Sequence, residues 1–328
     1  MPFQWRSSAC GSMIIPQISE SQANQLYASY AIGMRKSWRI IKASGQNIRT
    51  YLQGQITQDI QKLNETCGIY ACLLTPQGKP VSELYIFQIS TDVIYMLAPA
   101  SVAENVVSRL RQFSLGYTLR IGIIESLNLY SVQGVQSHVV LQSIFSYPDV
   151  PEPCHLAYIQ RPNSESIAIT ISDSPPGYWV IAAADDIAYI EASYLWDEAA
   201  FEAMRIYKGT PRFSIDWDST IHPMNANLVE FNGVSFDKGC YVGQEVTSRM
   251  HWRGGVKKKF YRVSIEHEPI SVPQNISNDI NIGKLTSACS TPDGCFGIAH
   301  LPVEFEHSDA QLTLASGGTI SIIEPCHA

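Results

Sequence analysis

The sequence predicts an α+β protein that ends in a small all-β part. Helical spacing of apolar residues alternates with β-branched runs over most of the chain, whereas only strand-like runs follow from about Phe260. The length of 328 residues exceeds what one hydrophobic core usually organises. We therefore expect two domains, at 1–255 and 256–328, with a sub-boundary near 147–156, where three prolines stiffen the chain.

The first predicted elements are two short helices within residues 44–63. Apolar side chains recur there at helical spacing, but Gly54 interrupts the pattern. A glycine inside a helix costs about 1 kcal/mol relative to alanine. We predict two helical pieces that meet at this glycine, with Thr57 or Asp59 near the start of the second; one bent amphipathic helix is the alternative.

A β-meander is predicted next, over residues 69–98. Turn residues at 76–78 and 90–92 separate runs that are rich in β-branched side chains. A helix over about 101–113 and a strand over about 117–124 complete this half of the first domain.

The remaining elements are predicted from turn and capping signals. Residues 166–171 and 178–183 form a predicted strand pair. A helix follows, with Asp197 as its N-cap and Gly209 as its stop. In the C-terminal part, the Gly-Gly pair within residues 312–323 predicts a hairpin.

The composition limits the classes of function. The balance of 23 basic against 30 acidic residues gives a net charge of −7, which argues against a protein that binds a polyanion over its whole surface. No apolar run approaches the roughly 20 residues of a membrane span. The N-terminal residues lack the apolar core of a signal peptide. We expect a cytoplasmic protein that does not enter the membrane.

The eight cysteines predict neither a disulfide framework nor a metal centre, because they are scattered and form no CxxC pair. They are Cys10, Cys67, Cys72, Cys154, Cys240, Cys289, Cys295 and Cys326. We expect structural roles for all of them except Cys240.

The stretch KGCYVGQE, residues 238–245, concentrates chemically active groups. It displays a thiol, a phenol, an amide and a carboxylate between glycines that allow a ligand to approach the backbone. Lys238, two residues from Cys240, favours the thiolate. A helix that begins near Gly243 would act in the same direction.

The same region also has a purely structural interpretation. Cys240 would then be a small buried hydrophobe, and Glu245 and Arg249 a surface pair worth a few tenths of a kcal/mol. The basic tract over residues 249–262 has two interpretations as well, as lysines that guard a strand edge or as an anion-binding rim.

KGCYVGQE, followed by TSRMHWRG, resembles the signature of the YgfZ family of folate-binding proteins, which are relatives of the glycine cleavage T-protein (aminomethyltransferase). Four further segments are similar to family motifs and occur in the family's order. They are YLQGQITQDI (51–60), ACLLTPQGK (71–79), RIYKGTP (205–211) and PMNANL (223–228). The resemblance spans roughly residues 36 to 262.

The resemblance implies a folate-binding α+β domain, followed by a small β-barrel, with tetrahydrofolate in a central cavity. A pterin offers adjacent N–H and NH₂ groups to a carboxylate and its ring to an aromatic side chain, and the glutamate tail suits cations. The expected cofactor-binding residues are Tyr241, Gln244, Glu245, Arg249 and Arg253. The expected catalytic residues are Cys240, Lys238 and Glu83.

One departure from the T-protein pattern concerns Glu83. T-protein relatives place a catalytic aspartate a few residues after the glycine that corresponds to Gly78, whereas this chain has Ser82 and Glu83 there. The T-protein also lacks the KGCY thiol. The sequence therefore points to the YgfZ branch, which is associated with folate-dependent assembly or maintenance of iron–sulfur clusters and, through those enzymes, with tRNA modification.

Three hypotheses follow. The first is a tetrahydrofolate-binding accessory protein with iron–sulfur enzymes or assembly proteins as clients and Cys240 as its functional thiol. The second is a folate-dependent aminomethyltransferase in which Glu83 is the acid–base group. The third is a nucleic-acid-binding module that uses the basic tract; the negative net charge speaks against it, so direct nucleic-acid binding is not expected.

Overall fold

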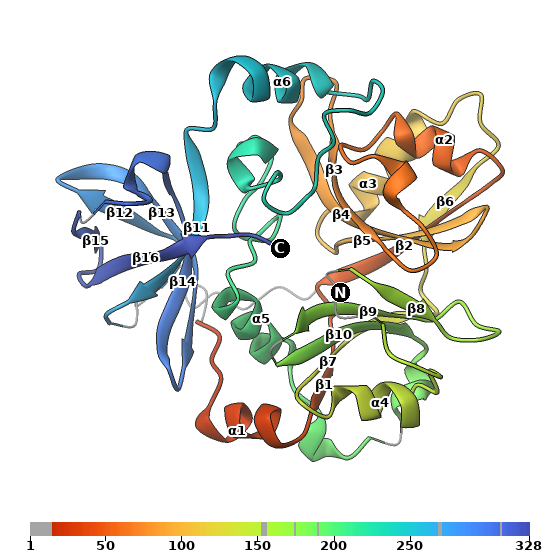
Figure 1. The fold of residues 1–328 in the computed structure, drawn as a ribbon, viewed down its shortest axis with the longest axis horizontal. Helices are drawn as coiled ribbons and strands as arrows, with labels where there is room; N and C mark the ends of the chain where they lie inside the picture. The colour runs from red at the N-terminus through yellow and green to blue at the C-terminus, as the bar shows by residue number, and fades with distance from the viewer. Residues whose placement is uncertain (1–14, 152–155, 174, 189, 268–270, 309) are drawn as a thin grey trace.

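The computed structural model describes residues 15–151, 156–173, 175–188, 190–267, 271–308 and 310–328. Two five-stranded sheets and a closed six-stranded barrel make up the β-structure. Figure 1 shows these three parts arranged around the middle of the molecule, where helix α5 lies between the barrel and the second sheet. The predicted α+β class with a C-terminal barrel is confirmed.

The first sheet is antiparallel, in the order β3-β4-β5-β2-β6. Its strands are β2 (Trp38–Ser44), β3 (Ile69–Leu74), β4 (Pro80–Ser90), β5 (Val93–Pro99) and β6 (Arg120–Ile123). Helices α2 (Ile48–Gln53) and α3 (Ala103–Gln112) bury their apolar side chains against one face of this sheet. The predicted meander is therefore confirmed, and the last predicted strand is shorter than expected.

The second sheet has the order β1-β7-β10-β9-β8. Its strands are β1 (Ala31–Met34), β7 (Asn128–Gln133), β8 (Tyr158–Gln160), β9 (Ile167–Asp173) and β10 (Pro176–Ala182). Helix α4 (Ser137–Ser143) covers one face. The other face shares a core with the first sheet, so that Trp179 and Ile181 pack in the same cluster as Trp38 and Tyr85.

The barrel consists of the last six strands, which are joined only by antiparallel pairs. They are β11 (Lys258–Ile265), β12 (Gln274–Asn278), β13 (Ile280–Thr291), β14 (Gly294–Pro302), β15 (Leu312–Leu314) and β16 (Thr319–Pro325). Gly317 and Gly318 both have positive φ values, +85° and +87°, which fits the predicted Gly-Gly hairpin between β15 and β16. These strands fall within the predicted range 256–328.

The remaining helices are α1 (Glu20–Ala28), α5 (Glu198–Tyr207) and α6 (Gln244–Arg249), and α6 continues into a π-helical turn at Met250–Gly254. Asp197 caps α5 by accepting a hydrogen bond from Ala200 N, and Gly209 follows with a positive φ of +69°. Both signals were predicted. Helix α1 and the π-helical turn were not.

The interrupted helix at residues 44–63 is confirmed as two pieces. Helix α2 ends before Gly54, and Asp59 caps a 3₁₀ turn at Ile60–Lys62 through a hydrogen bond from Gln61 N. The turn is 3₁₀ rather than α-helical.

Some predictions fall on residues outside the described ranges. They are residues 152–155 of the sub-boundary, residue 174 between β9 and β10, and Cys10 and Cys154. The two domain limits stay predictions. In the described ranges, every helix is too short or too polar to cross a membrane.

Candidate functional site

The signature loop, residues 237–243, rests on the segment that follows helix α2. Val242 N donates a hydrogen bond to Gly54 O at 3.0 Å. Two segments of the family resemblance, far apart in the sequence, therefore contact each other. The glycine that ends α2 leaves its carbonyl available as an acceptor for the loop.

The β3–β4 turn packs against the end of the same loop. Gly243, at φ +82°, is so close to this turn that an added Cβ would lie 2.6 Å from Thr75 O and 3.1 Å from Gly78 Cα. Gly78, at φ +78°, would in turn place a Cβ 2.9 Å from Val246 Cβ. The glycines of the ACLLTPQGK and KGCYVGQE motifs thus allow the two backbones to meet.

Lys238 anchors the loop from inside. Its Nζ donates hydrogen bonds to Ile56 O and Gln58 O, both at 2.8 Å, and lies 5.0 Å from the centre of the Tyr241 ring. Burial lowers the pKa of Lys238 to about 8, and the charge of Asp59 opposes this effect. The ammonium group is therefore held by backbone carbonyls beneath the loop.

Cys240 lies exposed at the surface. The structural interpretation that made it a buried hydrophobe is therefore wrong. Tyr241 is buried in the central core, and the half-buried Gln244 accepts a hydrogen bond from Tyr241 N through Oε1 at 3.1 Å. The loop presents its thiol to solvent while its aromatic and amide side chains hold it in place.

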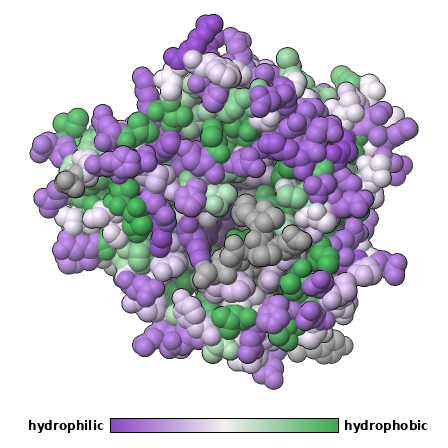
Figure 2. All heavy atoms as spheres, in the orientation of Figure 1, coloured by the Kyte–Doolittle hydropathy of each residue, from purple (hydrophilic) through white to green (hydrophobic). Residues whose placement is uncertain are grey.

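Glu245, Arg249 and Arg253 lie on the outer side of α6 and the π-helical turn. Arg249 Nη2 donates to Glu245 Oε1 at 2.6 Å, and these side chains are 63% and 84% exposed. This arrangement matches the surface ion pair of the structural interpretation. Figure 2 shows mostly hydrophilic and pale side chains at the top of the molecule, where Figure 1 places α6.

The basic tract is largely paired within the chain. Lys258 Nζ donates to Ile282 O at 2.9 Å. Lys259 forms an ion pair with Glu230 at 2.6 Å, and Arg262 forms one with Glu324 at 3.1 Å. These partners engage three of the cations that the nucleic-acid hypothesis would use.

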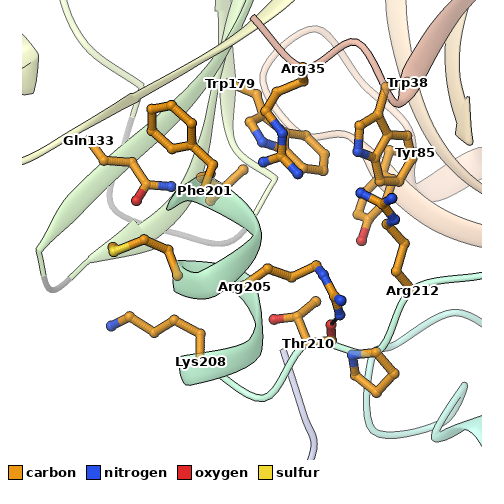
Figure 3. Close-up of a pocket in the computed structure, with 13 residues that line it drawn as sticks. Arg35, Trp38, Tyr85, Gln133, Trp179, Phe201, Arg205, Lys208, Thr210 and Arg212 are labelled. Carbon is orange, nitrogen blue, oxygen red and sulfur yellow. Dashed lines mark hydrogen bonds between the residues drawn. The ribbon is translucent and has the colours of Figure 1, made fainter. Parts of the chain in front are cut away.

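A separate cavity of about 80 Å³ lies between the two sheets and α5 (Figure 3). It is several times larger than the roughly 10–15 Å³ that one water molecule needs. Its walls come from β2, β4, β7, β9, β10, α5 and the segments at residues 35 and 208–212. The lining residues are Arg35, Trp38, Tyr85, Gln133, Ile171, Trp179, Phe201, Met204, Arg205, Lys208, Thr210, Pro211 and Arg212.

Aromatic rings form one wall of the cavity. The ring centres of Trp38, Tyr85 and Trp179 lie 5.1–5.6 Å from one another and meet at steep angles. The Arg212 guanidinium carbon lies 5.7 Å from the centre of the Trp38 ring. Aromatic surfaces beside a cation suit a planar, polar heterocycle.

A buried carboxylate holds the three cavity arginines in place. Glu202 accepts hydrogen bonds from Arg212 Nη1 at 2.7 Å, from Arg205 Nε at 2.9 Å and from Arg35 Nη2. Although burial opposes ionisation, the charges of Arg212, Arg205 and Arg35 outweigh it and lower the pKa of Glu202 to about 2. The carboxylate therefore stays ionised and fixes the guanidinium groups.

Four buried polar atoms of the cavity residues have no hydrogen-bond partner. They are Nε1 of Trp38, Nε1 of Trp179, Nε of Arg212 and Oε1 of Gln133. An unpartnered buried donor or acceptor costs about 1–3 kcal/mol. Three donors and one acceptor on residues that line one cavity are thus left without a partner.

Glu83 lies behind this wall and is fully buried. Its Oε2 accepts a hydrogen bond from Tyr70 OH at 2.9 Å, and its Oε1 accepts one from Phe213 N at 3.1 Å. Burial raises the pKa of Glu83 to about 7, although these two hydrogen bonds and the charges of Arg212 and Arg205 act in the opposite direction.

The structure thus distributes the predicted site residues over two places. Cys240, Glu245, Arg249 and Arg253 are at the surface near α6, with Lys238, Tyr241 and Gln244 supporting them from below, whereas Glu83 adjoins the cavity. Sequence reasoning did not identify the lining side chains as a set. The only local signal was RIYKGTP, which contains Arg205, Lys208, Thr210 and Pro211.

Comparisons with known proteins agree with the motif. No protein-family model matches the chain. It is 28% identical over 239 residues to the tRNA-modifying protein YgfZ of Hamiltonella defensa, covering 71% of this chain and 69% of that protein. It is also 28% identical over 250 residues to the YgfZ protein of Colwellia psychrerythraea, covering 74% of each.

In fold, the chain is similar to the glycine cleavage system aminomethyltransferase T of Bartonella henselae. The TM-score is 0.80 at 16% sequence identity, over 92% of this chain and 86% of that one. The resemblance inferred from the motif is therefore confirmed: this chain is similar in sequence to YgfZ proteins and has the fold of the glycine cleavage T-protein.

Proposed function

We propose that this protein is a cytoplasmic, tetrahydrofolate-binding accessory protein that supports the assembly or repair of iron–sulfur enzymes and, through them, tRNA modification. The sequence relatives are named tRNA-modifying proteins, and the similar structure is a glycine cleavage aminomethyltransferase. The cysteines of the described ranges are free thiols, as expected in a reducing compartment.

The observation that carries the proposal is the set of unpartnered polar atoms at the aromatic cavity. A pterin ring has carbonyl and ring-nitrogen acceptors, which suit the N–H groups of Trp38, Trp179 and Arg212, and it has N–H groups, which suit Gln133 Oε1. Its flat faces suit the aromatic wall. The residues present therefore fit the head group of tetrahydrofolate.

The cavity also supplies cations for the other end of the ligand. Lys208 lines it from the turn after α5, and Arg205, which also lines it, is already paired with Glu202 and Asp216. The glutamate tail of folate carries carboxylates, which pair with such side chains. This assignment replaces Arg249 and Arg253, which lie on the outer side of the α6 region, as the expected partners of the tail.

The exposed thiol is proposed to act on client proteins. Cys240 lies in a loop that Lys238 and Tyr241 anchor from below, so the sulfur is accessible to a second macromolecule. Iron–sulfur enzymes and their assembly proteins are the proposed clients. Bound folate would supply the one-carbon or reducing chemistry of a reduced pterin.

Folate binding is tested by thermal unfolding with and without tetrahydrofolate. A ligand that binds only the native state stabilises it by about 2.7 kcal/mol at 100 times its Kd, so the melting temperature must rise. Trp179→Phe removes one unpartnered N–H and should weaken binding about 5- to 20-fold. Trp196→Phe is the matched control, because Trp196 Nε1 is already bonded to Gln25 Oε1. No shift with the wild-type protein rejects the proposal.

The role of the thiol is tested in cells that lack the protein. Cys240→Ser should fold and bind tetrahydrofolate like the wild type but fail to restore iron–sulfur enzyme activity. Cys67→Ser is a control, since this half-buried cysteine lies outside the signature loop. Full rescue by Cys240→Ser would remove the thiol from the function.

No specific observation favours either the aminomethyltransferase or the nucleic-acid-binding module. An aminomethyltransferase would need Glu83 to reach the folate, but both of its oxygens are bonded to groups of the protein. A nucleic-acid-binding module would need free cations, but Lys258, Lys259 and Arg262 are all bonded within the chain.

A further inference from the structure

Glu83 connects two chain segments at the edge of the cavity. It belongs to β4, two residues before Tyr85, whose ring lines the cavity. Its Oε1 accepts from Phe213 N at 3.1 Å and its Oε2 accepts from Tyr70 OH at 2.9 Å. Glu83 is fully buried, each of its oxygens is held by a group of the protein, and it is not among the residues that line the cavity.

The residue next to Phe213 is Arg212, which contributes one of the unpartnered donors. Arg212 Nη1 donates to Glu202 Oε1 at 2.7 Å and to Ser37 Oγ at 3.0 Å, whereas Nε has no partner. Figure 3 shows the Arg212 guanidinium beside the Tyr85 ring. A carboxylate that holds the Phe213 amide therefore fixes the point from which the Arg212 side chain enters the cavity.

We propose that Glu83 is a positioning residue that holds the peptide at Phe213, and thereby aims Nε of Arg212 at the ligand, rather than a group that exchanges a proton with folate. This inference rests on the proposed function, because it assigns a role toward the same ligand. This role explains why a buried carboxylate lies next to the cavity although it is not part of the cavity lining.

The charged and titratable groups around Glu83 make its contribution depend on pH. Arg205 on α5 and Arg212 in the segment after α5 favour the ionised form of Glu83. Tyr70 and Cys72 on β3 have pKa values raised by burial and by the Glu83 charge. The same holds for Tyr85 on β4.

Those three neighbours are therefore neutral near pH 7, and Glu83 is the group that titrates. When Glu83 gains a proton as the pH falls through about 7, the guanidinium of Arg212 loses an attractive negative charge. The affinity for the ligand should therefore fall as Glu83 is protonated.

The first experiment measures the Kd of tetrahydrofolate between about pH 6 and 8 for the wild type, Glu83→Gln, Glu83→Met and Tyr70→Phe. Coupling between two linked sites typically changes an affinity about 5- to 150-fold, and we expect a change of about tenfold here. Wild-type affinity should weaken about tenfold toward pH 6. Glu83→Gln should be about tenfold weaker at pH 8 and independent of pH, and Tyr70→Phe, which keeps the carboxylate, should stay within about threefold of wild type.

Glutamine keeps an amide oxygen that can accept from Phe213 N, so Glu83→Met tests the hydrogen bond and Glu83→Gln tests the charge. The result that overturns the inference is an unchanged Kd in Glu83→Met together with an unchanged pH profile in Glu83→Gln. Loss of a folate-dependent turnover in that variant with normal binding would assign Glu83 to proton transfer instead. Circular dichroism of each variant confirms that it folds before the Kd is compared.

A second experiment needs no ligand and separates this inference from the proposed function. Glu83→Met has a similar shape but offers no acceptor to Phe213 N, so hydrogen exchange of that amide should accelerate at least about tenfold. Tyr70→Phe should leave the exchange rate within about threefold of wild type. Unchanged exchange in Glu83→Met contradicts the inference even if folate binds. A wild-type protein that binds no tetrahydrofolate, with accelerated exchange in the variant, rejects only the proposed function.

Discussion

Gly78 and Gly243 face each other across the contact between the β3–β4 turn and the signature loop. A Cβ on Gly243 would lie 3.1 Å from Gly78 Cα, and both glycines have positive φ values. The ACLLTPQGK and KGCYVGQE motifs, which carry the family resemblance, therefore pack against each other. The position of Cys240 at the surface depends on this contact, because Gly243 ends the loop that displays the thiol.

Gly243→Ala should destabilise the protein strongly. The left-handed conformation costs an alanine about 1–2 kcal/mol, and the contact with Thr75 O adds strain, so we expect a total loss of about 2–4 kcal/mol. Urea unfolding measures it. Gly239→Ala, in the same loop, meets nothing within 4 Å and should change stability by less than about 0.5 kcal/mol. Equal losses in the two variants would contradict the packing described.

Lys238→Met should destabilise the loop, because Ile56 O and Gln58 O lose their donor. We expect about 1–3 kcal/mol at pH 7 by urea unfolding. Lys62→Met, at a nearby exposed position, is the control and should have little effect.

The Lys238 effect should also depend on pH. Its pKa of about 8 in the folded protein is below the ordinary value of 10.5, so the unfolded chain binds more protons between these two values. Wild-type stability should therefore rise relative to Lys238→Met from about pH 8 to 10.5. A constant difference over this window would show that Lys238 is not held in a desolvated site.

Glu83 should give a pH dependence of the opposite sign. Its pKa of about 7 in the folded protein exceeds the ordinary 4.5, so the folded protein binds more protons between these values and its stability falls as the pH rises through them. Glu83→Gln lacks this titration. Its stability relative to wild type should therefore increase by about 1–3 kcal/mol from pH 5 to pH 8, measured by urea unfolding. Parallel stability curves would contradict a buried, titrating carboxyl group.

Asp216→Asn should loosen the attachment of the barrel to the cavity wall. Asp216 accepts hydrogen bonds from Arg205 Nη1, Thr286 Oγ1 and Ser287 Oγ, at 2.8, 2.8 and 2.5 Å. Because the change leaves a buried arginine without its full counter-charge, we expect a loss of about 3 kcal/mol by urea unfolding. Asp218→Asn, at an exposed position, should be nearly neutral. A neutral Asp216→Asn would show that this network does not hold the barrel.

Capping and turn residues predicted the helix and the hairpin that they bound. Asp197 and Gly209 gave the limits of α5, and the Gly-Gly pair gave the β15–β16 hairpin. Helix α1 was missed although Ser19 and Gln22 form a capping box. Only Leu26 of that helix is buried, so its sequence has no amphipathic periodicity to detect.

The cavity could not be predicted because no local pattern encodes it. Trp38, Gln133, Trp179 and Arg212 come from segments that only the packing of the two sheets and α5 brings together. The signature loop, in contrast, was visible because its residues are adjacent in the sequence.

Adjacency in the sequence also limited the site prediction. It could not separate Cys240 and Glu245, which point outward, from Lys238 and Tyr241, which point inward. The motif therefore grouped an exposed thiol with buried neighbours, whereas the side chains that line the cavity are far apart in the sequence.

The most direct test of the central claim is a crystal structure of the protein grown with tetrahydrofolate. We predict the pterin ring in the cavity against the Trp38, Tyr85 and Trp179 wall, within hydrogen-bond distance of Arg212 Nε and Gln133 Oε1. A ring bound against α6 instead, or a cavity without folate in crystals that are saturated with it, would contradict the account.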